Sequence, residues 1–359
     1  MKIVIVSGDF YPNNSPRSFR TTELVKQFSK LGHEVTIYIP RNNKDYGDFI
    51  KKYPAQIKYY DVKSGLSGNS LFTRILSRLL SMFLEYPDSS MISSIKDNLK
   101  RESGYDLLIT IAMPHPIHWA LGKLYDSGCK IAKTWIADCG DPYMLCGTNR
   151  IAKPFYFRSI EKLWCRKCSY ISVPTEDAKN GYYPEFRDKI RVIPQGFDFT
   201  EVKIQEYKRN DIPTFVFSGN IIPHVRDPRP LLDYLSGIDR NFKFIFYSTK
   251  HHLLNPYKER MGDRLEIHGY IPRLDLLYVL SGADFLVNIK NATSVQTPSK
   301  LIDYSLTRRP ILSVDPQNLD TAVIDEFLDG NYAHQFKVKD VEQYNIINVA
   351  NKFLNLTNN

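Results

Sequence analysis

The sequence of 359 residues lacks the features that define several large classes of protein. It has no apolar run of the roughly 18 to 20 residues that a membrane-spanning helix needs. Its five cysteines are an odd number in a long chain and do not suggest a disulfide framework. No nucleic-acid-binding motif is present, and the basic residues are spread along the chain rather than gathered in one arm. We therefore expect none of these three classes.

The sequence also offers little to bind a metal ion. Cys165 and Cys168 form a C-x-x-C pair, but the segment IEKLWCRKC has a helical pattern in which this spacing places two small apolar residues on one face. No second close pair and no histidine partner has the spacing of zinc ligands. We predict no metal site.

What remains is the composition of an ordinary globular protein. The chain is 43% hydrophobic and 24% charged, and it is long enough for two domains with separate cores. The net charge of +9 favours an anionic partner, which could be a membrane surface or a phosphorylated ligand. The opening stretch MKIVIVSGDF is typical of a buried strand rather than a signal peptide, so we expect a cytoplasmic protein.

Short apolar segments alternate with helical patterns along the chain. Strand-like segments of the first half are 2–8, 34–40, 106–112, 130–138, 169–175 and 191–198. After the polar link FTEVKIQEYKRND the alternation restarts, with strand-like segments at 214–219, 242–248, 264–270, 283–289 and 310–314. This alternation predicts an α/β protein with parallel sheets joined by right-handed crossovers.

Two such series predict two doubly wound, Rossmann-like domains. We expect the domains at 1–198 and 213–338, a linker at 199–212, and a C-terminal helix within 339–359 that packs back across the domains. Ligands of these folds bind beyond the carboxyl ends of the strands, so the loops that follow the strands are the places to search for function.

One such loop follows the first strand of the second half, in FSGNIIPHVRDPRPLL. Gly219 allows a close approach of the backbone, and Arg226 stands just before the helix that Asp227 and Pro228 begin. A guanidinium beside a helix N-terminus suits a diphosphate. The alternative is an ordinary surface arginine with Asp227 as a helix cap. A further loop carries Gly269, where a nucleotide base could lie against the backbone.

A second such place is the segment TPSKLIDYSLTRRP at 297–310. Capping by Thr297 and a proline at the first helical position explain why a helix begins there, but they leave Asp303 unexplained. Asp303 could accept hydrogen bonds from ribose hydroxyls. After Pro298, the first turn offers the backbone N–H groups of Ser299, Lys300 and Leu301 to the same end of the sheet, and Lys300 adds a cation.

The loops of the first half offer polar side chains as well. In GDFYPNNSPRSFR, Ser15 and Arg17 lie near a helix start, whereas we interpret Arg20 as a surface arginine. His115, between two prolines, could bind a sugar or transfer a proton, although a lone histidine is as often structural. Asp138 and Asp141, in WIADCGDPY, could orient an acceptor hydroxyl or act as a base. The alternative is that Asp141 and Pro142 only begin a turn.

Taken in order, these segments resemble the GT-B nucleotide-sugar glycosyltransferases, specifically those like family 4. KIVIVSGDFYP and the GHEV strand resemble the family's opening, and WIADCGDPY is similar to the D-x-R-D-P-W signature of one subgroup. SVPTEDAKNGY with VIPQGFD resembles the end of the N-terminal domain. FVFSGNI, RDPRPLL and PSKLIDYSLTRRPIL resemble the part that binds the donor.

The resemblance implies two Rossmann-like domains that face each other across a crevice. It implies transfer of a sugar from a nucleoside diphosphate sugar to an acceptor hydroxyl, with no required cofactor or metal and with retention of configuration. The donor site would comprise Gly219, Asn220, Arg226, Gly269, Pro298, Ser299, Lys300, Leu301 and Asp303. Ser15, Arg17, His115, Asp138 and Asp141 would face the acceptor, in surface-polysaccharide or glycolipid assembly.

The chain departs from the family pattern at several positions. Asp303 matches the second acid of the family's E-x7-E motif, but the first acid is replaced by Val295. The arginine that usually follows the Gly219 strand is replaced by Asn220, and the arginine of the D-x-R-D-P-W signature is replaced by Gly140. Two alternatives remain open, and Val295 and Asn220 support the second of them. One is a nucleotide-sugar epimerase of the same fold, and the other is a binding-only relative with a decayed donor site.

Two segments raise the question of a membrane surface. LFTRILSRLLSMFLEY, at 71–86, is apolar and carries Arg74 and Arg78 one turn apart, a pattern typical of helices that lie in a membrane interface. The alternative is a core helix with one solvated edge. The segment 150–168 adds six basic residues with interleaved aromatics. An anionic membrane surface on the inner face of the cell membrane is therefore a candidate partner, together with a sugar or lipid-linked acceptor.

Overall fold

The computed structural model describes residues 1–66, 68, 70–145, 153–249, 251–290 and 299–358. Within the chain two compact units form: unit 1 comprises residues 1–197 and 343–359, and unit 2 comprises residues 198–342. Pro298, Val295 and Thr297, which the sequence analysis singled out, lie outside the described residues, as does Cys146.

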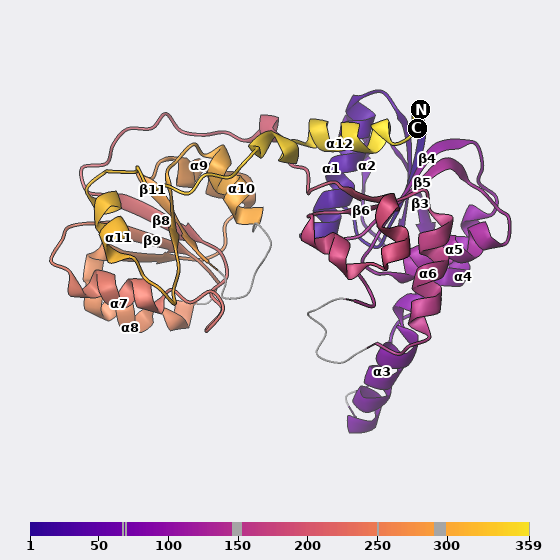
Figure 1. Ribbon diagram of the computed structural model, residues 1–359, viewed down its shortest axis with the longest axis horizontal. Helices are drawn as coiled ribbons and strands as arrows, with labels where there is room; N and C mark the ends of the chain where they lie inside the picture. The colour runs from indigo at the N-terminus through magenta and orange to yellow at the C-terminus, as the bar shows by residue number, and fades with distance from the viewer. Residues whose placement is uncertain (67, 69, 146–152, 250, 291–298, 359) are drawn as a thin grey trace. The chain divides into compact units, whose positions relative to one another are not determined.

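Unit 1 contains a seven-stranded parallel sheet with the order β3-β2-β1-β4-β5-β6-β7 (Figure 1). Its strands are β1 Lys2–Ser7, β2 Glu34–Pro40, β3 Gln56–Tyr60, β4 Tyr105–Ile111, β5 Ala132–Asp138, β6 Tyr170–Val173 and β7 Ile190–Val192. The sequence analysis predicted all of them except β3. This edge strand is partly exposed along most of its length, so its sequence, QIKYY, carries no continuous apolar run.

Helices cover both faces of this sheet. They are α1 Pro16–Lys30, α2 Gly47–Lys52, α4 Met91–Leu99, α5 Pro116–Asp126, α6 Phe157–Lys167 and α12 Ile346–Asn355; a further helix, α3 Leu71–Leu84, lies outside both cores. Because side chains alternate across a strand, Ile3 and Ile5 pack with α1, α2 and α12, whereas Val4 and Val6 pack with α4, α5 and α6. This double cover explains why the strands read as continuous apolar runs.

Unit 2 contains a five-stranded parallel sheet with the order β10-β9-β8-β11-β12. Its strands are β8 Thr214–Ser218, β9 Lys243–Tyr247, β10 Leu265–His268, β11 Phe285–Ile289 and β12 Ile311–Val314. Its helices are α7 Arg229–Gly237, α8 Asn255–Met261, α9 Arg273–Ser281, α10 Ser299–Leu306 and α11 Thr321–Leu328. The expected α/β architecture with two doubly wound sheets is confirmed.

The two faces of the second sheet are also covered by different helices. Phenylalanines of β8, β9 and β11 pack with α7, α8 and α11 on one face, and a smaller cluster with α9 and α10 covers the other. The link after Asp198 runs along unit 2, where the Tyr207 hydroxyl donates to Asp284 Oδ1 at 2.6 Å. Across the described ranges, no helix is both long and apolar enough to cross a membrane.

Candidate functional site

The loop after β8 begins with a glycine in a conformation that few other residues adopt. Gly219 has φ of 133°, and its N–H donates to the Tyr247 carbonyl at 2.9 Å. A Cβ at this position would lie 4.0 Å from both Arg226 Nη1 and Lys300 Cδ. Two cationic side chains from distant parts of unit 2 therefore flank the same backbone turn.

A buried tyrosine of α10 explains why Lys300 lies beside this turn. The Tyr304 side chain is fully buried, and its hydroxyl accepts the Ser218 N–H at 2.8 Å. This bond joins α10 to the carboxyl end of β8. The N-terminal turn of α10, whose N–H groups have no partner within the helix, is thereby held near Gly219.

Lys300 is a buried cation that has no hydrogen-bond partner among the described residues. Its Nζ atom lies 4.6 Å from the centre of the Phe217 ring. Burial and then the neighbouring Arg226 charge lower the pKa of Lys300 to about 7. Burial also lowers the pKa of Arg226, whose Nη1 lies 3.5 Å from the Asn220 carbonyl oxygen. An anion bound here would relieve the repulsion between the two cations.

Asp303 lies one turn further along α10, and it is paired with an arginine that the sequence analysis missed. The Arg273 guanidinium, at the start of α9, donates to Asp303 Oδ1 from Nε at 3.0 Å and from Nη2 at 2.5 Å. The two side chains are 27% and 21% exposed. Burial raises the pKa of Asp303 even though Arg273 opposes this shift. The carboxylate is held in place but is not closed off from solvent.

The remaining donor-side candidates differ in their surroundings. Asn220 and Gly269 are exposed, and Gly269 directly follows β10. Beside it, the rings of Tyr247 and His268 stack with centres 5.0 Å apart. Leu301 is buried in the core, so only its backbone can serve a ligand. The structure thus brings Gly219, Arg226 and Lys300 together.

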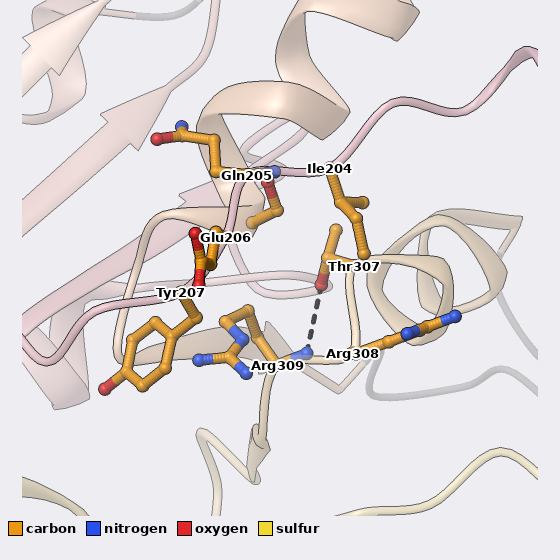
Figure 2. Close-up of a pocket in the computed structure, with 8 residues that line it drawn as sticks. Ile204, Gln205, Glu206, Tyr207, Thr307, Arg308 and Arg309 are labelled. Atoms are coloured by element: carbon orange, nitrogen blue, oxygen red, sulfur yellow. Dashed lines mark hydrogen bonds between the residues drawn. The ribbon is translucent and has the colours of Figure 1, made fainter.

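The opposite end of α10 borders a cavity of about 380 Å³ (Figure 2). Here the Arg309 guanidinium lies 3.7 Å from the centre of the Tyr207 ring, and its backbone N–H donates to Thr307 Oγ1 at 3.3 Å. Figure 2 shows the Arg308 side chain directed away from this stacked pair. Since these residues follow α10 whereas Lys300 lies in its first turn, the cavity is separate from the Gly219 turn.

In unit 1 the structure corrects the interpretation of Arg20, which is not a surface arginine. Arg20 and Asp138 side chains are each only 3% exposed. Arg20 donates to Asp138 Oδ2 from Nε at 3.1 Å and to Oδ1 from Nη2 at 2.8 Å, and it also donates to the Ile193 carbonyl at 3.1 Å. The signal was available in SPRSFR, where Arg20 falls on the same helix face as the apolar residues that α1 buries.

Asp138 is consequently an enclosed carboxylate rather than an open one. Besides Arg20, it accepts the Ser172 hydroxyl at 2.6 Å, and Arg17 Nη1 lies 3.7 Å from its Oδ2. Burial alone would raise the pKa of Asp138, but Arg20, Arg17 and Ser172 outweigh burial and lower it. Asp141, three residues on, is exposed.

Ser15 and Arg17 lie at the start of α1. The Ser15 hydroxyl caps the helix by accepting the Ser18 N–H at 3.0 Å. The Arg17 guanidinium lies against Gly140, where a Cβ would be 2.5 Å from Arg17 Nη2. The glycine at position 140, which departs from the family pattern, therefore makes room for Arg17.

His115 is buried at the start of α5, and its Nδ1 atom has no hydrogen-bond partner within the described part of the chain. Its ring centre lies 5.0 Å from that of Tyr143. Burial, followed by the charges of His118, Lys153 and Arg17, lowers the pKa of His115 to about 3. The side chain is therefore neutral at neutral pH, which suits hydrogen bonding better than proton transfer.

A second cavity, of about 230 Å³, lies at the carboxyl ends of β1 and β2. It is lined by Gly8, Asp9, Phe10, Asn13, Ile39, Pro40, Asn42, Lys44 and Tyr46. In the described ranges, no group of three or more His, Cys, Asp or Glu side chains could hold a metal ion.

Sequence comparison gives no match, since neither a protein-family model nor a curated protein matches the chain. Solved structures do match. HepE of Anabaena, in complex with UDP and glucose, aligns with a TM-score of 0.62 at 9% identity, over 99% of this chain and 98% of that chain. The lipopolysaccharide outer core galactosyltransferase WaaB, in its apo form, aligns with a TM-score of 0.59 at 12% identity, over 99% of both chains.

A third similar structure comes from a different class of enzyme. The UDP-GlcNAc 2-epimerase of Neisseria meningitidis, bound to UDP-GlcNAc, aligns with a TM-score of 0.56 at 12% identity, over 99% of both chains. At such identities the likeness establishes the fold alone. The chain has the GT-B fold, as the sequence analysis expected, and its chemistry has to be argued from its own residues.

Proposed function

We propose that the protein is a glycosyltransferase that moves a sugar from a nucleoside diphosphate sugar to an acceptor hydroxyl. The observation that supports it most is the convergence of Arg226 and the unpartnered Lys300 on the Gly219 turn, beside the first turn of α10. Two cations and free backbone N–H groups are the chemistry that binds a diphosphate. HepE was solved with UDP and glucose, which supports UDP as the first nucleotide to test.

In this proposal the residues of unit 2 hold the donor. Lys300, Arg226 and the N–H groups of Ser299 and Leu301 bind the diphosphate and stabilise the negative charge that grows on it as the bond to the sugar breaks. Asp303, fixed by Arg273, accepts hydrogen bonds from ribose hydroxyls. The base lies near Gly269. Pro298 and Asn220 complete the predicted donor set. The cations take the place of a metal ion.

The residues of unit 1 serve the acceptor. Ser15 and Arg17 lie at the start of α1, on the side that we assign to the acceptor. Neutral His115 can donate a hydrogen bond to a hydroxyl group or accept one from it. Asp138 acts through Arg17 rather than on the substrate, because its carboxylate is enclosed. The acceptor oxygen forms the new bond to the sugar and loses its proton, and exposed Asp141 is the candidate base.

The acceptor that we propose is a sugar or lipid-linked saccharide, in the assembly of surface polysaccharide or glycolipid. For a lipid-linked acceptor the reaction would take place at the inner face of the cell membrane. We propose a hexosyltransferase of the family 4 type that retains configuration. The replacement of the motif's first acid by Val295 leaves the contacts to the donor sugar open to experiment.

A second candidate is a nucleotide-sugar epimerase, which the likeness to the UDP-GlcNAc 2-epimerase favours. One assay, with and without an acceptor, distinguishes the epimerase activity from the transferase activity. An epimerase changes the nucleotide sugar without any acceptor, whereas a transferase releases the nucleoside diphosphate only when an acceptor hydroxyl or water takes the sugar.

The experiment that tests the proposal is calorimetric titration of the full chain with a panel of nucleoside diphosphates. We expect one of them to bind, and we expect Arg226→Ala to weaken binding by about 10- to 100-fold. Arg229→Ala is the matched control, because Arg229 is an exposed arginine three residues further on, at the start of α7, and is paired with Asp227. If no nucleoside diphosphate binds, or if both variants bind as tightly as wild type, the enzyme proposal is abandoned.

A further inference from the structure

Helix α3 is the part of unit 1 that the fold itself does not explain. None of its 14 residues is buried, and Leu71 and Phe72 are each 72% exposed. Figure 1 shows the helix extending away from the sheet of unit 1. The alternative of a core helix with one solvated edge is therefore wrong.

The exposed side chains of α3 are sorted into two faces. At 100° per residue, one half of the helix carries only apolar side chains, from Leu71, Phe72, Ile75, Leu76, Leu79, Leu80, Met82 and Phe83. The other half carries Thr73, Arg74, Ser77, Arg78 and Ser81, together with Leu84. No acidic residue lies between 71 and 84, and no ion pair to Arg74 or Arg78 occurs within the described ranges.

A second segment adds to this apolar surface. Phe155 is 85% exposed, and Tyr156, its neighbour, is also exposed. The Tyr156 hydroxyl donates to the Phe83 carbonyl, which places this segment beside the C-terminal end of α3. Exposed apolar side chains in such number on one helix and its neighbour mark an interaction surface. We call α3 with Phe155 and Tyr156 the α3 surface.

The basic residues between 150 and 168 contribute less charge than their number indicates. Lys153 is paired with Glu85, Lys162 with Glu185, and Lys167 with Asp126. The positive charge of the α3 surface therefore comes mainly from Arg74 and Arg78, which border its apolar face.

The C-terminal end of α3 is tied to the loops of unit 1 that contain the candidate acceptor residues. Glu85 ends the helix in the left-handed conformation, with φ of 51°. It accepts the Tyr143 hydroxyl at 2.7 Å, and the Tyr143 ring lies 5.0 Å from that of His115. Whatever binds the α3 surface is thereby held near the start of α5.

We infer that the α3 surface docks on an anionic lipid bilayer, with the helix lying in the plane of the interface. A helix of this length spans about 21 Å, short of the roughly 30 Å hydrocarbon core, so it lies on the bilayer. An amphipathic helix that carries arginines and no acids matches an anionic headgroup layer. A second copy of the chain fits less well, because pairing two apolar faces would leave Arg74 and Arg78 without an anionic partner, whereas an anionic headgroup layer supplies one.

This inference does not depend on the donor site, but with the proposed function it identifies the acceptor as a membrane-borne one. Interface binding would hold the His115 loop next to a lipid-linked saccharide. A failure of one proposal leaves the other standing, because lipid binding and nucleotide binding are measured separately.

The test is co-sedimentation of the full chain at low salt with vesicles of phosphatidylcholine alone and of phosphatidylcholine mixed with phosphatidylglycerol. We expect binding to the mixed vesicles and much weaker binding to the neutral ones. Leu79→Glu, in the centre of the apolar face, should lower the partition coefficient by about tenfold or more. Arg74→Gln and Arg78→Gln should each lower it by roughly fivefold, on anionic vesicles only.

Ser77→Glu is the matched control, since it adds the same charge to the polar face. Its smaller loss should equal the electrostatic part of the Leu79→Glu effect. Unchanged melting temperatures and unchanged nucleotide binding would show that the variants are folded. Equal binding of wild type to both vesicle types, equal losses for Leu79→Glu and Ser77→Glu, or a dimer by light scattering that Leu79→Glu dissociates would overturn the inference.

Discussion

The two units each contain an arginine–aspartate pair that the sequence analysis did not predict: it singled out both aspartates, but it interpreted Arg20 as a surface arginine and did not name Arg273. In unit 1, Arg20 and Asp138 are almost completely buried, and a hydroxyl and backbone carbonyls satisfy their remaining hydrogen-bonding capacity. In unit 2, Arg273 and Asp303 are about one quarter exposed. Beyond them lie Lys300 and Arg226, which repel each other.

This difference in exposure and charge compensation indicates which group stabilises the fold and which group binds a ligand. Where charges are compensated within the protein, removing one of them leaves an uncompensated buried charge, so the effect falls on folding. Where a buried lysine lies beside a second cation and its Nζ has no hydrogen-bond partner among the described residues, as at Lys300, a bound anion would stabilise its charged form. The closed pair of unit 1 therefore suits a structural role, and the open group of unit 2 suits an anion site.

The largest effect should come from breaking the closed pair. Arg20→Leu leaves Asp138 buried without its main partner, and we expect a loss of about 3 to 5 kcal/mol in the free energy of unfolding. Urea denaturation measures it. Arg41→Leu is the control, because Arg41 and Asp61 form an exposed pair whose loss should cost about 1 kcal/mol or less. Similar losses for the two variants would contradict the distinction.

The next effect concerns the open group. Lys300→Met should weaken binding of the nucleoside diphosphate by about 10- to 100-fold while leaving the melting temperature of the free protein unchanged or higher. Because the pKa of Lys300 is lowered to about 7, a bound anion should raise it again. Wild-type affinity should then fall as the pH rises above about 7, with uptake of up to about one proton on binding. Calorimetry in buffers of different ionisation enthalpy measures this uptake, which Lys300→Met should abolish.

A smaller effect tests the role of Asp303. Asp303→Asn keeps one acceptor oxygen and should weaken binding of the ribonucleoside diphosphate by roughly fivefold. The loss should shrink with the 2′-deoxy compound, because the carboxylate then has fewer hydroxyl groups to bind. An equal loss for both ligands would assign Asp303 to holding Arg273 instead of the ribose.

The smallest effect is that the contributions of the two aspartates to stability change with pH in opposite directions. Asp138 has a lowered pKa, so the stability that its charge contributes is present above about pH 4 and is lost as the pH falls further. Asp303 has a raised pKa, so its contribution declines as the pH rises through the window above about pH 4. The cost of Asp138→Asn should thus grow with pH, and that of Asp303→Asn should shrink. Slopes of the same sign in urea denaturation would show that the two environments are alike.

Much of the fold was readable from the sequence, because strands buried on both faces form continuous apolar runs. KIVIVSG and DLLITIA are such runs, and both are central strands. The edge strand β3 was missed because most of its residues are partly exposed. For the helix α3 the sequence left an interface helix and a core helix both open, since apolar content alone does not tell whether a partner within the protein exists.

The sequence predicted those residues of the candidate site whose role depends on the backbone and on a position after a strand. Gly219, Arg226 and Lys300 all follow that rule, and the structure brings them together. Partners that come from distant elements were not readable. Arg273 is separated from Asp303 by 30 residues and Arg20 from Asp138 by 118, so neither pair leaves a local pattern.

The C-terminal helix has a practical consequence for dissecting the molecule. Unit 1 is discontinuous: α12 supplies Val349 and Phe353 to its core, and the Arg20 guanidinium lies 5.0 Å from the Phe353 ring. A fragment ending at residue 197 would therefore expose the apolar side of α1 and would be prone to aggregate. An isolated first domain has to carry residues 343–359, supplied through a short artificial connection in place of unit 2.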